Sequence, residues 1–325
     1  MSTASPPALA DVRAAARRLE GVLQPTPLLC PHRLSEIVGV PVFLKPENLQ
    51  RTGSFKIRGA YNAVAILSPA ARRCGVVTYS SGNHAQALAL TAKLFGIPAV
   101  VVMPVDAPRE KVDGTRAYGA KVVFAGYTTV DRRAKAEALR TKHGYTMVPP
   151  YDHPAIMAGQ GTIGLEILAE AEGLDAVLVP VSGGGLISGI ATAIKGAGGR
   201  SCPKVVAVEP ADANDTQRSL RAGRRVKLER TPKTIADGLR ALSLGDLPYK
   251  VIRKKVDAAV TVTDADILRA MKFLAREAKL VVEPSGAVGV AALLAGRFRP
   301  RGPTVVVLSG GNVSSELVGT LAGKT

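Results

Sequence analysis

Tryptophan is absent from this chain of 325 residues, and aromatic side chains make up only 4% of it. With so few rings beside its basic residues, the chain offers little on which nucleic-acid bases can stack. The three cysteines, Cys30, Cys74 and Cys202, are too widely spaced for a CxxC zinc site or a disulfide framework. Their number and spacing predict a reducing compartment, and we expect a cytoplasmic protein.

Long apolar runs are also missing. The richest of them, AVVVMPV and GVGVAALLAG, fall well short of the roughly 18–20 residues that a membrane span requires, and they contain proline or glycine. The N-terminal stretch MSTASPPALADVRAAARR has no apolar segment of the kind found in secretory signals. We therefore expect neither a membrane span nor an exported protein.

Acidic residues are outnumbered, because 26 Asp and Glu stand against 43 Lys and Arg and give a formal net charge of +17. A charge this high raises nucleic acid as a partner. The basic residues are dispersed, however, and the densest stretch, 195–255, still interleaves 15 of them with 6 acidic residues. The dispersion favours a role in solubility, so we expect no nucleic-acid partner. A basic nucleic-acid-binding protein is the alternative from another class.

Short valine-rich runs alternate with helical periodicity along most of the chain. This alternation predicts an α/β fold with mostly parallel sheets flanked by helices. The strand–helix units of residues 75–148 predict a small domain, and residues 1–74 with 149–325 a large one. We expect strands at 42–45, 75–79, 98–104, 120–126, 176–181, 204–210 and 304–309.

Three strand-to-helix junctions carry glycine: SSGNHAQ at 80–86, VSGGGLISG at 181–189 and LSGGNVSS at 308–315. In parallel α/β sheets, ligands lie at the carboxyl ends of strands, where helix N-termini offer unpaired N–H groups. Glycine lets that backbone approach an anion closely. Together the three junctions predict one shared anionic ligand, although each alone is also compatible with an ordinary glycine turn. None has the GxGxxG or GxxxxGK[ST] nucleotide pattern.

Lys56 has an unusual setting within SFKIRG, where Phe55 and Ile57 flank it. A helix over 54–67 with Ser54 as its N-cap would hold this lysine in the first turn. Apolar surroundings lower the pKa of a lysine and make its neutral amine available for Schiff-base chemistry. The alternative is a solvated lysine on the outer face of an amphipathic helix.

A series of motifs in fixed order covers roughly residues 10–320. It resembles the pyridoxal-phosphate enzymes of the threonine/serine dehydratase and serine racemase family, which have the tryptophan-synthase-β-like fold (fold type II). The resemblance implies a two-domain enzyme whose cofactor lies between the domains. The motifs are KPENLQRTGSFKIRGA, SSGNHAQALA, PPYDHPAIMAGQGTIGLEI, VPVSGGGLISGI, EPADAND, TIADGL, VVEPSGAVGVAALL and LSGGN.

The resemblance implies that Lys56 binds pyridoxal 5'-phosphate covalently and then acts as the base that removes the substrate's Cα proton. Ser309 is implied as the partner of the ring nitrogen, and a hydroxyl there, in place of a carboxylate, favours β-elimination over transamination. The other implied cofactor residues are the phosphate loop Ser182, Gly183, Gly184, Gly185 and Leu186, and, around the ring, Phe55, Asn83, Gly238 and Glu283.

The SSGNH segment is implied to hold the substrate carboxylate at a helix N-terminus, through Ser80, Ser81, Gly82, Asn83 and His84. For His84 the alternative is a capping or packing role. Ser81 also matches the serine with which racemases reprotonate Cα from the face opposite the lysine. Dehydratases share that serine, so both activities stay open.

The motif EPADAND matches a divalent-cation site in the family, with Glu209, the carbonyl of Ala213 and Asp215 as ligands. Oxygen ligands of this kind suit Mg²⁺, Mn²⁺ or Ca²⁺. The alternative is a solvent-exposed acidic loop after a strand.

The resulting hypothesis is β-elimination of water from L-threonine and L-serine, which gives 2-oxobutyrate or pyruvate and ammonia. The alternatives are a serine racemase, or a lyase for a related substrate such as 3-hydroxyaspartate or a hydroxyectoine breakdown product. The expected partner is a small hydroxy amino acid, and the family resemblance implies a homodimer. Little sequence follows LSGGN, so we expect no C-terminal regulatory domain.

Overall fold

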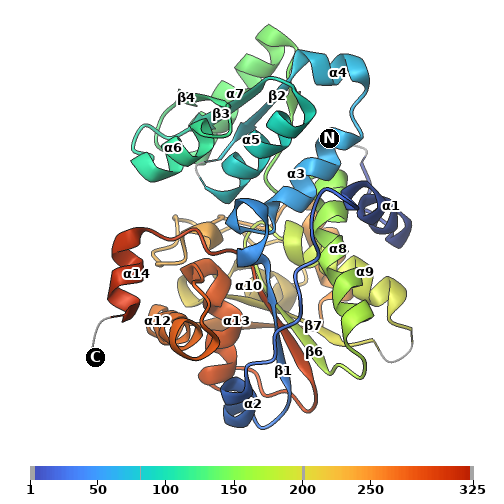
Figure 1. The fold of residues 1–325 in the computed structure, drawn as a ribbon, viewed down its shortest axis with the longest axis vertical. Coiled ribbons are helices and arrows are strands. Elements are labelled where there is room, and N and C mark those ends of the chain that lie inside the picture. The colour runs from blue at the N-terminus through green and yellow to red at the C-terminus, as the bar shows by residue number, and fades with distance from the viewer. Residues whose placement is uncertain (1–3, 81, 200–201, 323–325) are drawn as a thin grey trace.

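The computed structural model describes residues 4–80, 82–199 and 202–322 of the chain. The described residues form two separate sheets, and all strand pairs within each sheet are parallel. Figure 1 shows the two sheets one above the other, each with helices packed around it. The predicted α/β class with parallel sheets flanked by helices is therefore confirmed.

The larger sheet has the strand order β1–β9–β6–β7–β8, and the smaller sheet has the order β4–β3–β2–β5. The strands of the larger sheet are β1 (Val42–Pro46), β6 (Ala176–Pro180), β7 (Lys204–Pro210), β8 (Ala258–Val262) and β9 (Thr304–Leu308). Those of the smaller sheet are β2 (Val76–Tyr79), β3 (Ala99–Met103), β4 (Lys121–Phe124) and β5 (Thr146–Met147).

The helices follow the strands in the alternating order that the sequence predicts. They are α1 (Leu9–Leu19), α2 (His32–Val38), α3 (Lys56–Ala65), α4 (Pro69–Cys74), α5 (Asn83–Phe95), α6 (Arg109–Arg116), α7 (Thr129–His143), α8 (Pro154–Glu170), α9 (Gly185–Ala197), α10 (Asp215–Ala222), α11 (Asp246–Lys255), α12 (Asp264–Phe273), α13 (Pro284–Leu294) and α14 (Ser315–Ala322). Short helical turns are η1 (Glu47–Leu49), η2 (Arg51–Gly53), η3 (Ala211–Ala213), η4 (Asp237–Leu239) and η5 (Leu274–Ala278).

How deeply a strand is buried explains whether its sequence pattern predicts it. Each residue of β3, β6 and β9 is buried, and these strands read as unbroken apolar runs. Strand β8 lies at the edge of the larger sheet, and four of its five residues are only partly buried. Its sequence AAVTV therefore lacks the valine-rich signature, and none of the expected strands covers it.

Close packing of α3 on α8 depends on glycine. A Cβ atom at Gly159 would lie 2.6 Å from the carbonyl oxygen of Arg58 and from the Cα of Gly59. A Cβ atom at Gly59 would in turn lie 2.5 Å from the side chain of Gln160. The two helices therefore approach more closely than larger residues would allow, and α8 supports the helix that begins at Lys56.

A buried network of charges also fixes this helix. The Arg58 guanidinium donates to Glu47 at 2.7 and 2.8 Å and to Glu166 of α8 at 2.9 Å. Lys45 of β1 pairs with Glu166 at 2.9 Å. Because Arg58, Glu47 and Lys45 are buried, the network ties α3 to β1 and α8 at the level of the first helical turn.

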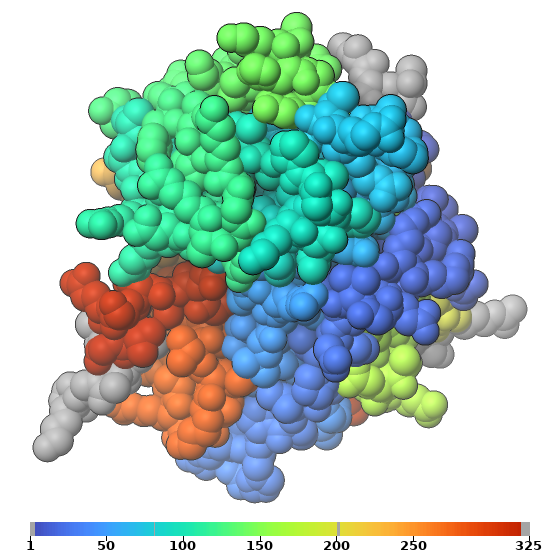
Figure 2. All heavy atoms as spheres, turned by 45° about the horizontal axis from the view of Figure 1, so that its top comes forward, coloured from blue at the N-terminus to red at the C-terminus, as the bar shows by residue number. Residues whose placement is uncertain are grey.

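All four strands of the smaller sheet come from residues 76–147, and Figure 2 shows this part of the chain as one body on one side of the molecule. An ion pair between Lys111 of α6 and Asp237 of η4 connects it to the rest. Among the described residues, no helix combines the length and apolar character that a membrane crossing demands.

Candidate active site

Lys56 is the first residue of α3, and the chain ahead of it pairs with the third glycine junction. Ser54 forms a β-bridge with Gly310, and the Phe55 N–H donates to the carbonyl of Ser309 at 3.2 Å. The expectation that Ser54 caps the helix is wrong, because Phe55 occupies the N-cap position without a side-chain hydrogen bond. The long-range pairing with residues 309–310, which local sequence does not encode, decides where the helix begins.

The Lys56 side chain is partly buried. Its Nζ donates a 2.8 Å hydrogen bond to the carbonyl of Pro150 and lies 5.1 Å from the centre of the Phe55 ring. Burial lowers the pKa of this lysine to about 8, against an opposing effect of Glu283. A lowered pKa makes neutral amine available near pH 7, as Schiff-base chemistry requires.

Residues 182–186 form a tight loop between β6 and the N-terminus of α9. Gly184 has φ +89°, a left-handed conformation that favours glycine, and a Cβ at Gly183 would lie 2.5 Å from the Tyr151 ring. Toward the other described residues, the N–H groups of Gly183, Gly184, Gly185 and Leu186 donate no hydrogen bond. Unpaired donors at a helix N-terminus fit a phosphate dianion.

Asn83 connects the first and third glycine junctions. Its side-chain amide donates to Glu283 at 2.8 Å, and its Oδ1 accepts from the Asn312 amide at 2.9 Å. Burial and, next, the negative charge of Asp237 raise the pKa of Glu283 to about 7. The structure thus brings Asn83, Glu283 and the 308–315 junction together beside Lys56.

Two further predicted cofactor residues lie at the same edge of the larger sheet. Ser309 follows β9 directly and is buried, and its carbonyl binds the chain ahead of Lys56. The Gly238 N–H donates to the Ser285 hydroxyl at 2.9 Å, and a Cβ at this glycine would lie equally close to that oxygen. Both positions are tightly packed.

The predicted substrate segment lies at the start of α5. Ser80 Oγ accepts from the Gly82 N–H at 3.3 Å, whereas Ser81 lies outside the described residues. His84 is buried, and its Nε2 lies 3.0 Å from the carbonyl of Val148. Burial and the nearby Lys56 lower the pKa of His84 to about 3, so its ring is neutral at pH 7.

Glu209, Ala213 and Asp215 lie together at the end of β7, and all three are buried. Glu209 accepts from the N–H groups of Gln217 at 2.8 Å and Thr216 at 3.2 Å, while Asp215 Oδ2 is buried with no described hydrogen-bond partner. Burial raises the pKa of Glu209 to about 8 and that of Asp215 to about 7. The alternative of a solvent-exposed acidic loop is therefore wrong.

The described residues contain no group of three His, Cys, Asp or Glu side chains that could hold a metal ion. The expected set offers two carboxylates and one backbone carbonyl, which is a weaker set of ligands. The divalent cation at Glu209, Ala213 and Asp215 therefore stays a prediction.

A neighbouring pocket includes Pro150, whose carbonyl accepts the hydrogen bond from Lys56, and three residues of its lining were not among the predicted ones: Tyr79, Arg133 and Tyr151. Tyr151 lies within the motif PPYDHP. Its ring lies beside the glycine loop, because a Cβ atom added at Gly183 would lie 2.5 Å from that ring. Arg133 adjoins Arg132 in α7, and which of the two side chains lines the pocket depends on the rotation of α7 against its sheet.

A partly buried amine with a lowered pKa, near a glycine loop with unpaired N–H groups, defines a class of enzyme. This class binds a phosphorylated aldehyde through a lysine and its phosphate through backbone amides. The sequence pattern of the family described as "Pyridoxal-phosphate dependent enzyme" matches residues 19–310. The chain belongs to this family, and the residues described above fit its cofactor.

Relatives with defined activities cover nearly all of this chain. The L-threo-3-hydroxyaspartate ammonia-lyase of Saccharomyces cerevisiae is 44% identical over 316 residues, which cover 97% of this chain and 96% of that protein. The L-threonine ammonia-lyase of Thermotoga maritima is 44% identical over 317 residues, or 97% and 78% of the two chains. The structure of maize serine racemase superposes with a TM-score of 0.93 at 38% identity, covering 97% and 96%.

These similarities confirm the predicted family and the predicted enzyme class. The chain is similar to pyridoxal-phosphate-dependent ammonia-lyases and racemases, and its solved neighbours share the predicted fold type. The relatives act on different amino acids, so the substrate of this chain is a matter of proposal.

Proposed function

We propose that this chain is an ammonia-lyase that removes water from a hydroxy amino acid by β-elimination. Candidate substrates are L-threonine, L-serine and L-threo-3-hydroxyaspartate, which would give 2-oxobutyrate, pyruvate and oxaloacetate, each with ammonia. The observation that carries the proposal is the partly buried Lys56 amine close to the three glycine junctions. The names of the ammonia-lyase relatives support the reaction type.

Lys56 has two roles in this account. It holds the cofactor covalently and, once the substrate amine has taken its place there, its free amine accepts the Cα proton. When bound, pyridoxal phosphate supplies the electron sink that makes the Cα–H bond breakable. The lowered pKa of Lys56, about 8, supports both roles because each requires a neutral amine.

The remaining site residues would orient the cofactor and determine the type of reaction. The N–H groups of residues 183–186 would bind the cofactor phosphate, and Asn83, Gly238 and Glu283 would border the ring. Ser309 would face the ring nitrogen with a hydroxyl, which leaves that nitrogen largely neutral. The β-hydroxyl then departs as water after protonation, and the released enamine takes up water to give a 2-oxo acid and ammonia.

The N-terminus of α5 would hold the substrate's α-carboxylate, through Ser80, Ser81, Gly82 and Asn83. The buried ring of His84 supports this segment by its contact with Val148 and does not need to touch substrate. Racemisation is the second candidate, supported by the similarity to a serine racemase structure, with Ser81 as the proton donor on the opposite face.

One experiment separates these two activities. The holoenzyme is incubated with L-serine, and pyruvate, ammonia and D-serine are quantified from the same reaction. Equal amounts of pyruvate and ammonia with no D-serine support the lyase, whereas D-serine as the main product contradicts it.

We extend the proposal to a divalent cation such as Mg²⁺ at Glu209, the Ala213 carbonyl and Asp215. The unpartnered, buried Asp215 oxygen supports it, because a cation would supply the missing partner. A cytoplasmic homodimer is proposed on the sparse cysteines and the family resemblance, and light scattering of the holoenzyme tests the dimer.

A further inference from the structure

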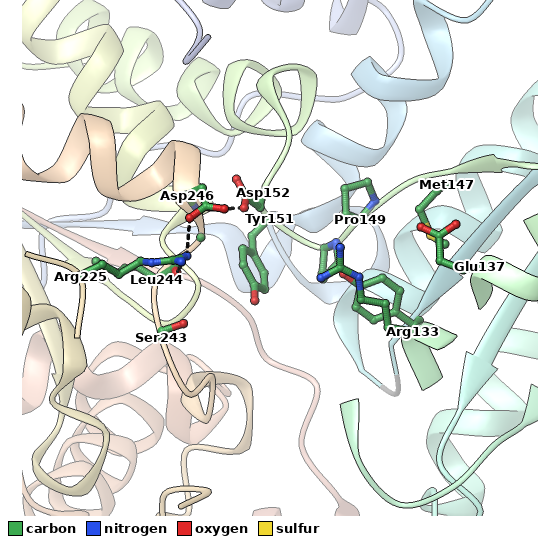
Figure 3. A pocket seen from close by; sticks show the side chains of 13 residues that line it. Arg133, Glu137, Met147, Pro149, Tyr151, Asp152, Arg225, Ser243, Leu244 and Asp246 are labelled. Atoms are coloured by element: carbon green, nitrogen blue, oxygen red, sulfur yellow. Dashed lines mark hydrogen bonds and ion pairs between the residues drawn. The ribbon is translucent and has the colours of Figure 1, made fainter. Parts of the chain in front are cut away.

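Three consecutive residues between β5 and α8 contact three different parts of the cofactor site. The Pro150 carbonyl accepts the 2.8 Å hydrogen bond from Lys56. The Tyr151 ring lies so close to the glycine loop that a Cβ at Gly183 would be 2.5 Å from it. Figure 3 shows the side chain of the third residue, Asp152, at the start of α11.

Asp152 supplies the cap that helix α11 lacks locally. The N-cap residue of α11 is Gly245, which has no side chain that could accept a hydrogen bond. The two carboxylate oxygens of Asp152 accept instead from the N–H groups of Asp246 at 2.9 Å and Leu247 at 3.1 Å. A Cβ at Gly245 would lie 2.7 Å from the Asp152 Cγ, so this approach requires glycine.

Helix α11 in turn supports the glycine loop. The Gly245 N–H donates to the carbonyl of Gly183 at 3.0 Å, and the Pro248 carbonyl accepts from the Ser188 hydroxyl of α9 at 3.3 Å. A Cβ at Gly184 would lie 2.8 Å from the Pro248 side chain. The loop is therefore packed directly on α11, and a shift in the first turn of that helix would move the loop.

We propose that Asp152 is a positioning residue for the cofactor phosphate, which it serves by capping α11 and so fixing the glycine loop. The inference rests on the proposal that residues 183–186 bind that phosphate, and it does not depend on the substrate. One ring carries both the aldehyde and the phosphate arm of the cofactor, so Lys56 and the loop must be held at a matching separation. Segment 150–152 joins the two, because Pro150 binds Lys56 and Asp152 holds the helix behind the loop.

Pyridoxal and pyridoxal phosphate isolate this effect, because they share the aldehyde that reacts with Lys56 and differ only in the phosphate. Equilibrium titration of the full chain, freed of cofactor, gives the ratio of the two dissociation constants, which is the preference for the phosphorylated compound. Asp152→Ala is expected to reduce this preference about 5- to 30-fold and to change pyridoxal binding less than about threefold. Asp152→Asn, which keeps one acceptor oxygen, is expected to give an intermediate preference.

A matched control separates positioning from a loss of stability. Asp266 is a buried carboxylate that caps α12, where it accepts from the Thr263 N–H at 3.0 Å. Asp266→Ala is expected to lower Tm and to preserve the preference. Gly245→Ala is expected to reduce the preference although Asp152 is intact, because the added Cβ pushes the carboxylate away from α11. Phosphorus NMR of the holoenzyme is expected to show a shifted phosphate signal in Asp152→Ala and an unshifted one in Asp266→Ala.

The outcomes distinguish the role of Asp152 from the assignment of the loop. A wild type that binds pyridoxal as tightly as pyridoxal phosphate would refute residues 183–186 as the phosphate site, and the role of Asp152 with it. A preference that Asp152→Ala and Gly245→Ala both retain would leave the loop assignment standing and overturn the role of Asp152. An equal loss of affinity for the two compounds would also overturn it, because Asp152 would then serve only the stability of the fold.

Discussion

The Nζ of Lys56 donates a 2.8 Å hydrogen bond to the carbonyl of Pro150, 94 residues further along the chain. This contact joins the first turn of α3 to the segment that enters α8, in which the Tyr151 ring lies beside Gly183 of the glycine loop. The carbonyl does not cancel the effect of burial, because the pKa of Lys56 is still lowered to about 8. The amine is thus both fixed in position and easily deprotonated.

Uptake of the cofactor by the apo chain is expected to depend on this pKa. The attacking species is the neutral amine, whose fraction rises about tenfold per pH unit below the pKa and levels off above it. Stopped-flow absorbance with pyridoxal phosphate should therefore show a rate that rises with pH and reaches a plateau above about 8. Glu283→Gln removes the charge that raises this pKa and should move the midpoint to lower pH. A midpoint near that of free lysine would contradict the account.

The glycine loop should tolerate no added methyl group at Gly183. A Cβ there would lie 2.5 Å from the Tyr151 ring, so Gly183→Ala must displace either the ring or the loop. Overpacking costs about 1–3 kcal/mol, which predicts a loss of pyridoxal phosphate affinity of about 10- to 100-fold in an equilibrium titration. Gly319→Ala is the matched control, since a Cβ there has no atom within 4 Å. Unchanged affinity in Gly183→Ala would argue against this loop as the phosphate site.

The charge network behind α3 should carry much of the stability of that region. Arg58→Ala leaves Glu47 buried without its main partner, and breaking a buried pair costs about 3–5 kcal/mol in the free energy of unfolding. Arg33→Ala removes an exposed pair with Glu36 and should cost under about 1 kcal/mol. Urea denaturation of both variants measures the difference. Similar small losses would show that the network is not a main support of α3.

The cation proposal predicts a stability effect that depends on Glu209. Mg²⁺ at about 100 times its Kd should stabilise the wild-type fold by about 2.7 kcal/mol and raise Tm in a thermal scan. Glu209→Gln should abolish that increase, whereas Asp212→Asn, at a partly exposed acid of the same segment, should retain it. No change in Tm of the wild type with Mg²⁺, Mn²⁺ or Ca²⁺ would refute the site.

Sequence patterns predicted the glycine junctions and the buried strands because both depend on local requirements. Strands β3, β6 and β9 are buried along their whole length, and fully buried strands read as continuous apolar runs. Gly184 needs a left-handed backbone, which the triplet Gly183–Gly185 signals directly.

The remaining features depend on contacts between distant residues. Helix α3 begins two residues later than its sequence suggests, because Ser54 pairs with Gly310 across the molecule. Strand β8 is Ala-rich and half-buried, so no apolar run marks it. The orientation of Arg133 toward Tyr151 follows from how α7 packs on its sheet, which the adjacent pair of arginines cannot encode.

Release of 2-oxo acid and ammonia from L-threonine and L-threo-3-hydroxyaspartate, by the wild-type holoenzyme and by Lys56→Ala, tests the central claim most directly. The account predicts equal amounts of 2-oxo acid and ammonia from the wild type. In Lys56→Ala it predicts a rate at least about 10³-fold lower, because one amine serves as cofactor anchor and base. A wild-type enzyme that carries its cofactor yet forms no 2-oxo acid, or a Lys56→Ala variant of undiminished rate, would contradict it.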